Sequence, residues 1–216
     1  MTAPKVPLPR SVLFCALLSL FLGTCTGMTS TGEAIALSQD SVATRVAEPD
    51  ASPEEVRLGE AITGFQEARL RAIRPFRTWK QLTLWGLSLA SMLTMVTALR
   101  VLVPAGLPRA ALVRGLSTAA IGAAVLRTVD GAMEFVLARR LALPMSEVWQ
   151  AQMALQLAGQ DAQTMALAEQ MKAQLPGAYS GFTAVLTLVV AGSFLAVGQY
   201  LGSERIRAAF APATPQ

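Results

Sequence analysis

Three ionisable residues near the middle of the chain are the strongest candidates for chemistry: Arg127, Asp130 and Glu134. On a helix, their spacing of three and then four residues places them on one face, where Arg127 can pair with Asp130. Ionisable groups at bilayer depth cost about 2.5 to 3.5 kcal/mol each on insertion scales, so they often mark a path for protons or ions. The other interpretation is an exposed ion-pair network in a protruding helix end, which is favoured because the clean apolar stretch ends at Leu126.

The rest of the chain offers few residue types that carry catalysis. Histidine is absent, and the two cysteines, Cys15 and Cys25, both lie in the first apolar stretch. Nucleophiles activated by imidazole and metal sites ligated by histidine are therefore excluded. The sequence has no phosphate-binding glycine loop, metal-ligand cluster or nucleic-acid motif. It predicts a non-enzymatic protein with no catalytic residue, no metal, no cofactor and no nucleic-acid partner.

The composition indicates the class of protein that must position the charged cluster. The 216 residues are 53% hydrophobic and 15% charged, and the mean hydropathy is +0.46. These values are typical of a membrane protein and exclude a disordered or fibrous chain. The predicted fold is an all-α integral membrane protein, with a three-helix transmembrane bundle and flanking amphipathic helices after an N-terminal signal segment.

The N-terminal region has the layout of a secretory signal. Residues 1–10 are basic and proline-rich, residues 11–25 are uncharged and apolar, and a Thr/Ser-rich stretch follows. The apolar run is short for a spanning helix, which needs about 20 residues, so a cleaved signal is favoured over an anchor. Residues 22–25 also resemble a lipobox, but Thr24 stands where a smaller residue is expected, and lipidation of Cys25 stays open.

Breaks, caps and apolar runs divide the remainder of the chain. Ser52, Pro53 and Glu55 have the spacing of a capping box, and Pro104 and Pro108 flank a turn too short for anything but an antiparallel connection. The predicted organisation is, in order, a signal peptide or signal anchor at 1–25, a disordered polar linker at 26–52, an amphipathic, basic juxtamembrane helix at 53–80, a transmembrane helix at 82–103, a long transmembrane helix with a protruding charged end at 110–142, an extramembrane helical segment at 145–175, a transmembrane helix at 182–201 and a tail at 203–216.

A block of basic residues ends the juxtamembrane helix. Its members, which no acidic residue interrupts, are Arg69, Arg71, Arg74, Arg77 and Lys80. Juxtamembrane basic residues each gain about 1 kcal/mol near an anionic surface, so the block could contact lipid headgroups or an acidic partner. An ordinary interfacial anchor, with Trp79 and Trp85 at headgroup depth, is the favoured interpretation.

Small residues at helical spacing predict close helix packing. Two such rows are Gly115, Ala119 and Ala123 in the second span, and Gly198 and Gly202 at the end of the third. We expect these rows to serve packing within the bundle first and contacts between copies second.

The order of the spans constrains topology. If the first two spans both cross, the helix at 54–80 and the helices at 145–175 lie on one side of the membrane. A translocating signal would place that side outside the cell, whereas the positive-inside rule would place its basic residues in the cytoplasm. The signal is the favoured interpretation.

The leading functional prediction is a non-enzymatic integral membrane protein of the bacterial inner membrane that acts by association. It would be a small envelope component or an accessory subunit, with the lipid bilayer and a second copy or another membrane protein as partners. The alternative is a proton- or ion-coupled transport component that uses Asp130 and Glu134, which also implies an oligomer or a partner chain because three spans are few. An intramembrane enzyme is the weakest hypothesis, because no nucleophile lies beside a recognised activating base.

Overall fold

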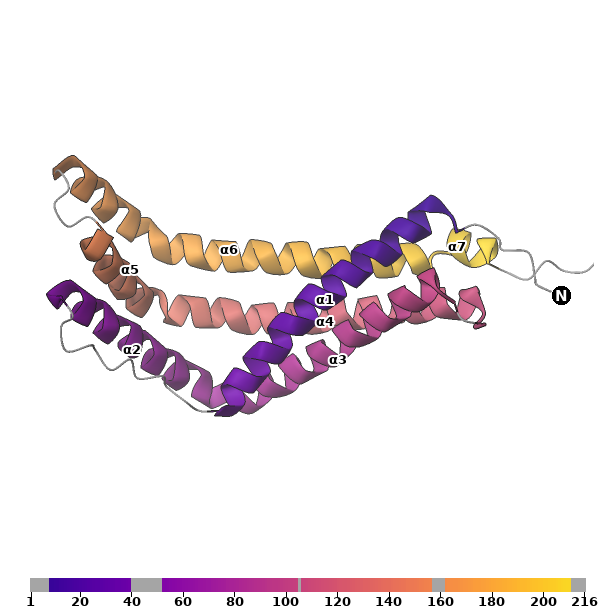
Figure 1. Ribbon diagram of the computed structural model, residues 1–216, viewed down its shortest axis with the longest axis horizontal. Helices are drawn as coiled ribbons and strands as arrows, with labels where there is room; N and C mark the ends of the chain where they lie inside the picture. The colour runs from indigo at the N-terminus through magenta and orange to yellow at the C-terminus, as the bar shows by residue number, and fades with distance from the viewer. Residues whose placement is uncertain (1–7, 40–51, 105, 157–161, 211–216) are drawn as a thin grey trace, which may run out of the picture. The chain divides into compact units, whose positions relative to one another are not determined.

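The structure, a computed structural model, describes residues 8–39, 52–104, 106–156 and 162–210, which form helices and contain no strand. This confirms the all-α fold. The elements, shown in Figure 1, are α1 (Arg10–Gln39), α2 (Pro53–Ile73), the short 3₁₀ helix η1 (Arg74–Phe76), α3 (Arg77–Leu102), α4 (Arg109–Arg140), α5 (Ala142–Gln156), α6 (Ala162–Gly202) and α7 (Glu204–Ala209).

Among the described residues, four helical stretches are long and apolar enough to cross a membrane, whereas the sequence predicted three. They lie in Arg10–Gln39, Pro53–Leu102, Arg109–Arg140 and Gly177–Gly202. The additional one is α1, which continues to Gln39 through part of the stretch predicted as a polar linker at 26–52. The rest of that predicted linker, residues 40–51, lies outside the described residues.

Hydroxyl groups explain why α1 is longer than its apolar run. Thr24 donates a hydrogen bond to the Leu20 carbonyl at 2.8 Å, and Ser30 donates to the Thr26 carbonyl at 2.7 Å. Each bond goes one turn back along the same helix, so these polar side chains need no water. A segment that looks like a solvated linker by composition can therefore form a helix of 30 residues.

Other boundaries also differ from the sequence prediction. The predicted helix at 53–80 is divided by η1, in which Pro75 follows the end of α2, and α3 begins at Arg77. The predicted segment at 145–175 is divided as well, between α5 and the first part of α6. In the structure α6 then continues as one helix through the predicted span at 182–201. In the tail predicted at 203–216, residues Glu204–Ala209 form α7.

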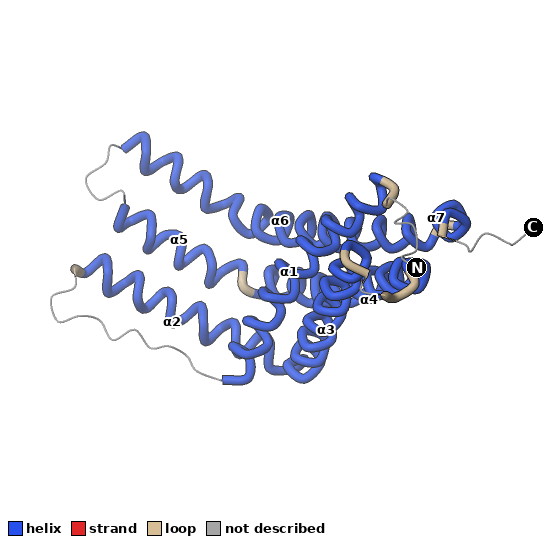
Figure 2. The backbone as a smooth tube through the Cα atoms, turned by 45° about the vertical axis from the view of Figure 1, so that its right-hand side comes forward, coloured by secondary structure: helices blue, strands red, loops and turns tan. Residues whose placement is uncertain are grey.

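The chain forms two compact units, each made of separate segments. Unit 1 comprises Met1–Ile35, Leu82–Val129 and Thr187–Gln216, and unit 2 comprises Ala36–Gln81 and Asp130–Leu186. Helices α1, α3, α4 and α6, which are drawn as blue coils in Figure 2, therefore each contribute to both units.

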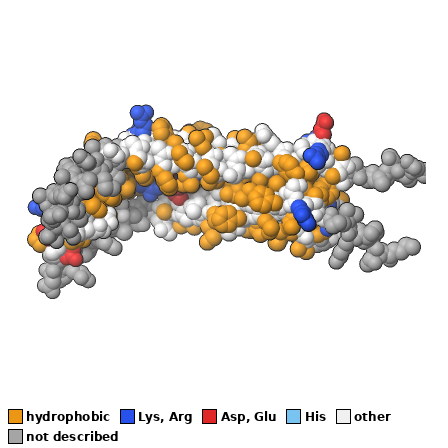
Figure 3. Space-filling view, turned by 90° about the horizontal axis from the view of Figure 1, so that it is seen from above, with side chains coloured by type: hydrophobic (Ala, Val, Ile, Leu, Met, Phe, Trp, Pro, Cys, Tyr) orange, Lys and Arg blue, Asp and Glu red, His pale blue; other side chains and the backbone are white. Residues whose placement is uncertain are grey.

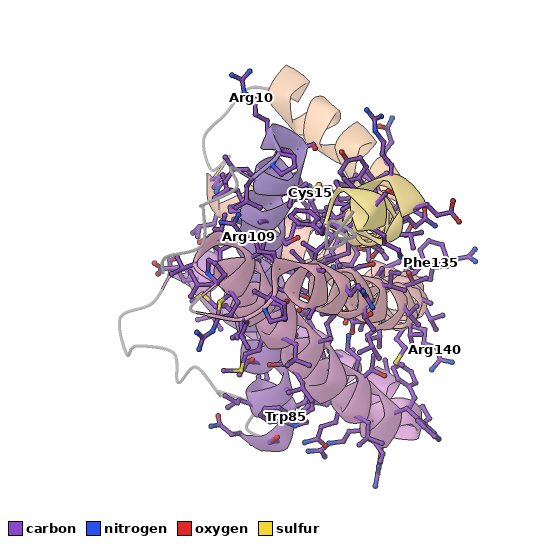
Figure 4. All side chains as sticks on the ribbon, turned by 90° about the vertical axis from the view of Figure 1, so that its right-hand side faces the viewer. Arg10, Cys15, Trp85, Arg109, Phe135 and Arg140 are labelled. Carbon is purple, nitrogen blue, oxygen red and sulfur yellow. The ribbon has the colours of Figure 1, made fainter. Side chains whose placement is uncertain are left out.

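The core of unit 1 consists of apolar side chains from four long helices and α7. Figure 4 labels Cys15, the α1 member of this core that lies two turns from the N-terminal end of the helix, and Arg109, the first residue of α4. The fully buried residues of this core are Val12, Ala16, Ala98, Val101, Leu116, Ala120, Ala123, Phe194 and Leu201. Their spacing of three, four or seven residues gives each long helix one stripe that faces the others.

Large apolar side chains also point away from the core of unit 1. Examples are Phe14 on α1, Leu89 on α3, Val125 on α4 and Leu188 on α6, which are all exposed. Figure 3 shows hydrophobic side chains over much of the face that it draws. Helices that are hydrophobic on both their inner and outer faces are expected in a membrane span rather than in water.

Unit 2 contains α2 packed along α5 (Figure 1). The start of α2 has the predicted capping box: the Glu55 N–H donates to Ser52 Oγ at 3.2 Å, and the Ser52 N–H donates to Glu55 Oε2 at 2.7 Å. Hydrogen bonds from the backbone and then the side chain of Ser52 hold the pKa of Glu55 below its usual range. The box satisfies amides that the first helical turn leaves without partners.

Candidate functional site

The most polar buried cluster that the structure describes lies in unit 2, where Lys80 meets Asp130 and Glu134. The Lys80 Nζ donates to Asp130 Oδ1 and to Glu134 Oε1, each at 2.5 Å. Lys80 is the fourth residue of α3, and the two acids are one turn apart on α4. We refer to these three residues as the lysine triad.

Burial decreases across the lysine triad. The Lys80 side chain is 0% exposed, that of Asp130 is 1% exposed and that of Glu134 is 25% exposed. Long charged side chains are almost never fully buried unless they are paired, because a buried charge loses its hydration. The ammonium and the two carboxylates therefore stabilise one another, with Glu134 as the member that reaches solvent.

Neighbouring contacts fix the position of Lys80. Arg77 Nη2 donates to the Leu37 carbonyl at 2.6 Å, in the last turn of α1. Gln81 Nε2 donates to Ser38 Oγ at 2.9 Å. A cation at a helix C-terminus satisfies a carbonyl that has no partner within the helix and interacts favourably with the helix dipole. The first turns of α3 are therefore anchored on both sides of Lys80 in the sequence.

The lysine triad can perform two kinds of chemistry. As an ionic lock, it holds the start of α3 against the second half of α4, and removal of one partner would leave an uncompensated buried charge. As a proton-exchanging group, its solvent-accessible carboxylate could pass a proton toward the buried pair. Both roles depend on the same three atoms, Lys80 Nζ, Asp130 Oδ1 and Glu134 Oε1.

The structure places two residues of the cluster that the sequence singled out, Asp130 and Glu134, beside Lys80. The third, Arg127, is half-buried on α4 three residues before Asp130. Sequence reasoning assigned Lys80 to a surface block and did not connect it with the acids.

A signal for this pairing is present in the sequence. Lys80 lies 26 residues before Gly106, and Asp130 and Glu134 lie 24 and 28 residues after it. Gly106 has a φ of +84°, in the left-handed region that favours glycine, and marks the turn between α3 and α4. In an antiparallel helical hairpin, residues equally distant from the turn lie at the same level, so a lone lysine and two acids at matching distances predict an ion pair.

The predicted basic block does not form one uniform surface. Lys80 is buried in the lysine triad and Arg77 binds the end of α1, while Arg69 is half-buried. Arg71 and Arg74 are exposed, and the Arg71 guanidinium lies 3.9 Å from Glu67. The exposed members of the block, Arg71 and Arg74, therefore remain the candidates for contact with lipid headgroups or a partner.

The small residues singled out by the sequence have different surroundings in unit 1. A Cβ on Gly198 would lie 2.6 Å from Ile121 Cγ1 and 3.1 Å from the Ser117 carbonyl, and one on Gly202 would lie 2.9 Å from Ser117 Oγ. Ser117 Oγ also donates to the Gly198 carbonyl at 2.6 Å. These contacts place α4 and α6 in backbone-to-backbone proximity, which side chains larger than glycine would prevent.

The other row, on α4, packs less closely. Ala123 is fully buried in the core of unit 1 and Ala119 is half-buried. A Cβ on Gly115 would meet Thr97 Cγ2 at 3.8 Å, an ordinary contact distance. The row thus contributes a core residue, while the tight contacts between α4 and α6 lie at Gly198 and Gly202.

One close glycine contact was not predicted from the sequence. A Cβ on Gly23 of α1 would lie 2.8 Å from the Ser91 carbonyl of α3 and 3.2 Å from the Met95 amide. Eight residues after Gly23 on α1, Thr31 Oγ1 lies 2.6 Å from Ser88 Oγ of α3. This part of α1 was interpreted from the sequence as a signal and a linker, so no partner helix was predicted for it.

Comparison with protein-family models, with curated proteins and with solved structures gives no match.

Proposed function

We propose that the protein is an integral membrane protein of the bacterial inner membrane with four spans, contributed by α1, α3, α4 and α6, and that it acts by association as an accessory subunit or small envelope component. The length and apolar character of these helices support the spans. Apolar side chains on both the core side and the outer side of unit 1 support contact with lipid.

The packing of α1 supports its retention as a span. Val12, Cys15 and Ala16 belong to the core of unit 1, and Gly23 lies against the backbone of α3. Removal of residues 1–25 as a cleaved signal would take these groups away and open the core to lipid or water. Loss of several buried side chains costs a few kcal/mol each, which favours an uncleaved helix.

With four spans, α2 and α5 would lie on one side of the membrane, and both ends of the chain on the other. The basic residues near α2 and α5 favour the cytoplasm for their side, which requires α1 to cross with its N-terminus outside and not to act as a translocating signal. Reporter fusions placed after residue 50 and after residue 210 test this orientation. Cytoplasmic activity at the first site and periplasmic activity at the second are expected, and the reverse pattern would contradict it.

The observation that best supports an associating role is that the lysine triad holds the protein's own helices together. Lys80 is completely enclosed between two carboxylates, so the cluster stabilises the protein's own helices. The exposed polar positions of α2, such as Arg57, Glu60 and Arg71, remain for a partner. We therefore expect the partner to bind on α2, through charged side chains.

Cross-linking in the native membrane, followed by solubilisation in mild detergent, tests this proposal. A second polypeptide, or a second copy, should co-purify at fixed stoichiometry. The double variant Glu60→Arg, Arg71→Glu should lower its recovery at least tenfold, while the control Arg205→Glu on α7 should not. A lone monomer that cross-links to nothing would contradict an associating role.

A second candidate function is proton- or ion-coupled transport, favoured by the partial exposure of Glu134 beside two buried partners. In this case the Asp130→Asn, Glu134→Gln variant should abolish proton flux in reconstituted vesicles while the protein still assembles. Flux that is unchanged in this variant would exclude the transport hypothesis.

A further inference from the structure

A small cavity in unit 1 lies between the start of α4, the end of α6 and α7. Its volume is about 130 Å³. Most of the lining residues are apolar, namely Ala110, Val113, Leu201, Ile206 and Phe210, and the other two are the exposed arginines Arg114 and Arg207. We propose that this cavity binds the phosphate headgroup and first methylenes of an anionic phospholipid, an inference that rests on the membrane placement proposed above.

The size of the cavity limits the class of ligand. Pockets for drug-sized molecules and cofactors usually occupy about 300 to 1,000 Å³, whereas one ordered water needs only about 10 to 15 Å³. A cavity of about 130 Å³ is too small for a nucleotide and large enough for a phosphate with part of a chain.

The charges of the lining select an anion. Arg114 and Arg207 come from different helices and present two planar forks, a geometry that matches phosphate oxygens. Arg114 is also in the second turn of α4, a helix of 32 residues whose N-terminal dipole carries partial positive charge. Both guanidinium groups and the helix end therefore favour a negatively charged ligand.

The apolar wall and the position of α7 favour a lipid over a free anion. Ile206 is buried in the core of unit 1 and Phe210 packs against that core, while Arg205 and Arg207 are exposed. This pattern makes α7 an interfacial helix, with one face on apolar groups and the other in water. In a four-span protein, the end of α6 and the start of α4 lie at headgroup depth, where basic pockets between helices bind anionic lipids.

Lipid selectivity of the purified full-length protein tests the site. The protein in mild detergent is offered equal amounts of phosphatidylglycerol and phosphatidylcholine, and bound lipid is measured by native mass spectrometry. We expect retention of phosphatidylglycerol over phosphatidylcholine. The Arg114→Gln, Arg207→Gln variant should weaken phosphatidylglycerol binding about 30-fold, which equals about 2 kcal/mol because 1.4 kcal/mol is a tenfold change.

Matched variants and a second ligand make the result specific. Arg139→Gln, Arg140→Gln removes two exposed arginines at the other end of α4 and should change binding less than about threefold. Phe210→Ala should weaken phosphatidylglycerol binding but leave inorganic phosphate unaffected. Equal lipid loss in the control and the cavity variant, or no loss in the cavity variant, would overturn the proposal, as would inorganic phosphate that binds as tightly as the lipid.

Two different results would contradict the lipid-headgroup site and the four-span proposal. A chain that alkaline carbonate releases from membranes contradicts the spans. A chain that stays in the membrane but shows no preference for the anionic lipid contradicts the headgroup site alone.

Discussion

The two units are stabilised by different kinds of contact. Unit 1 depends on small and apolar side chains, with Gly23 and Gly198 allowing backbones to approach and Ser117 donating to a carbonyl on another helix. Unit 2 depends on charged side chains, with Lys80 between two carboxylates and Arg77 on the end of α1. Contacts between small or apolar side chains can form with many different partners, whereas contacts between charged side chains determine which residues must meet.

The difference predicts how each unit responds to mutation. In unit 1, volume matters most, because lipid tails provide little hydrophobic drive for association and packing depends on contact distance. In unit 2, charge balance matters most, because a buried charge without its partner is costly. Four experiments separate these effects, in decreasing order of expected magnitude.

The largest effect is expected for Lys80→Met. This change leaves the buried Asp130 and the adjacent Glu134 without their cation, and should destabilise the protein by about 3 to 5 kcal/mol. The free energy of unfolding in mixed detergent micelles is the measurement. The variant Lys80→Met, Asp130→Leu, Glu134→Gln should recover most of the loss, and a single variant that loses less than about 1 kcal/mol would show that the lysine triad is not a lock.

The next effect is expected for Gly198→Ala in unit 1. The added Cβ would overlap Ile121 Cγ1 and approach the Ser117 carbonyl, so α4 and α6 must move apart at a cost of about 1 to 3 kcal/mol. Gly192→Ala on the same helix is the matched control, since its Cβ would meet no atom within 4 Å among the described residues. Thermal unfolding of the two variants should differ clearly; equal midpoints would mean that the helices do not pack as closely as described.

A smaller effect is expected for Arg77→Met. Loss of the donor removes this hydrogen bond to the Leu37 carbonyl, and should cost about 0.5 to 1.5 kcal/mol because water can partly replace the donor at this part-buried position. Hydrogen exchange of the amides in the last turn of α1 and the first turn of α3 reports the change. Arg74→Met, which removes an exposed arginine three residues earlier, serves as the comparison and should leave exchange unaltered.

The smallest effect concerns the capping box of α2. Because the pKa of Glu55 is lowered in the folded state, its carboxylate stabilises the start of α2 above its ordinary pKa, and this contribution is lost as the pH falls through the lowered value. The protection factors of the amides in the first turn of α2, which correct for the intrinsic pH dependence of amide exchange, should therefore fall on acidification. In Glu55→Gln the same amides should respond far less to pH, and an identical response in both proteins would rule out the carboxylate as the cause.

The helical class, the capping box and the small residues of the α4–α6 contact could be anticipated because each depends on local spacing. Ser52 and Glu55 are three residues apart, and Gly198 and Gly202 are four apart. The fourth apolar helix was not counted because the apolar run at 11–25 is short for a span, although α1 as a whole is apolar enough to cross a membrane. The helix continues past that run to Gln39, and hydroxyl groups such as that of Ser30 bond to the helix itself.

The site was only partly predictable for a related reason. Asp130 and Glu134 were visible as an unusual acidic pair in an apolar region, but their partner is 50 residues away in the sequence from Asp130. Helical periodicity reports neighbours along one helix and says nothing about neighbours on the next one. Distance from the turn at Gly106 supplies the missing information, and it requires two helices to be considered together.

Both cysteines of the chain, Cys15 and Cys25, lie on α1, where the first is buried and the second is exposed. The thiol content of the protein isolated from cells therefore counts the copies of α1 that remain attached to it. A chain with one rapidly alkylated and one protected thiol carries a packed α1, whereas two rapid thiols report a helix that has left the core. A chain without thiols has lost at least the part of α1 through Cys25, which includes the residues that α1 contributes to the core of unit 1.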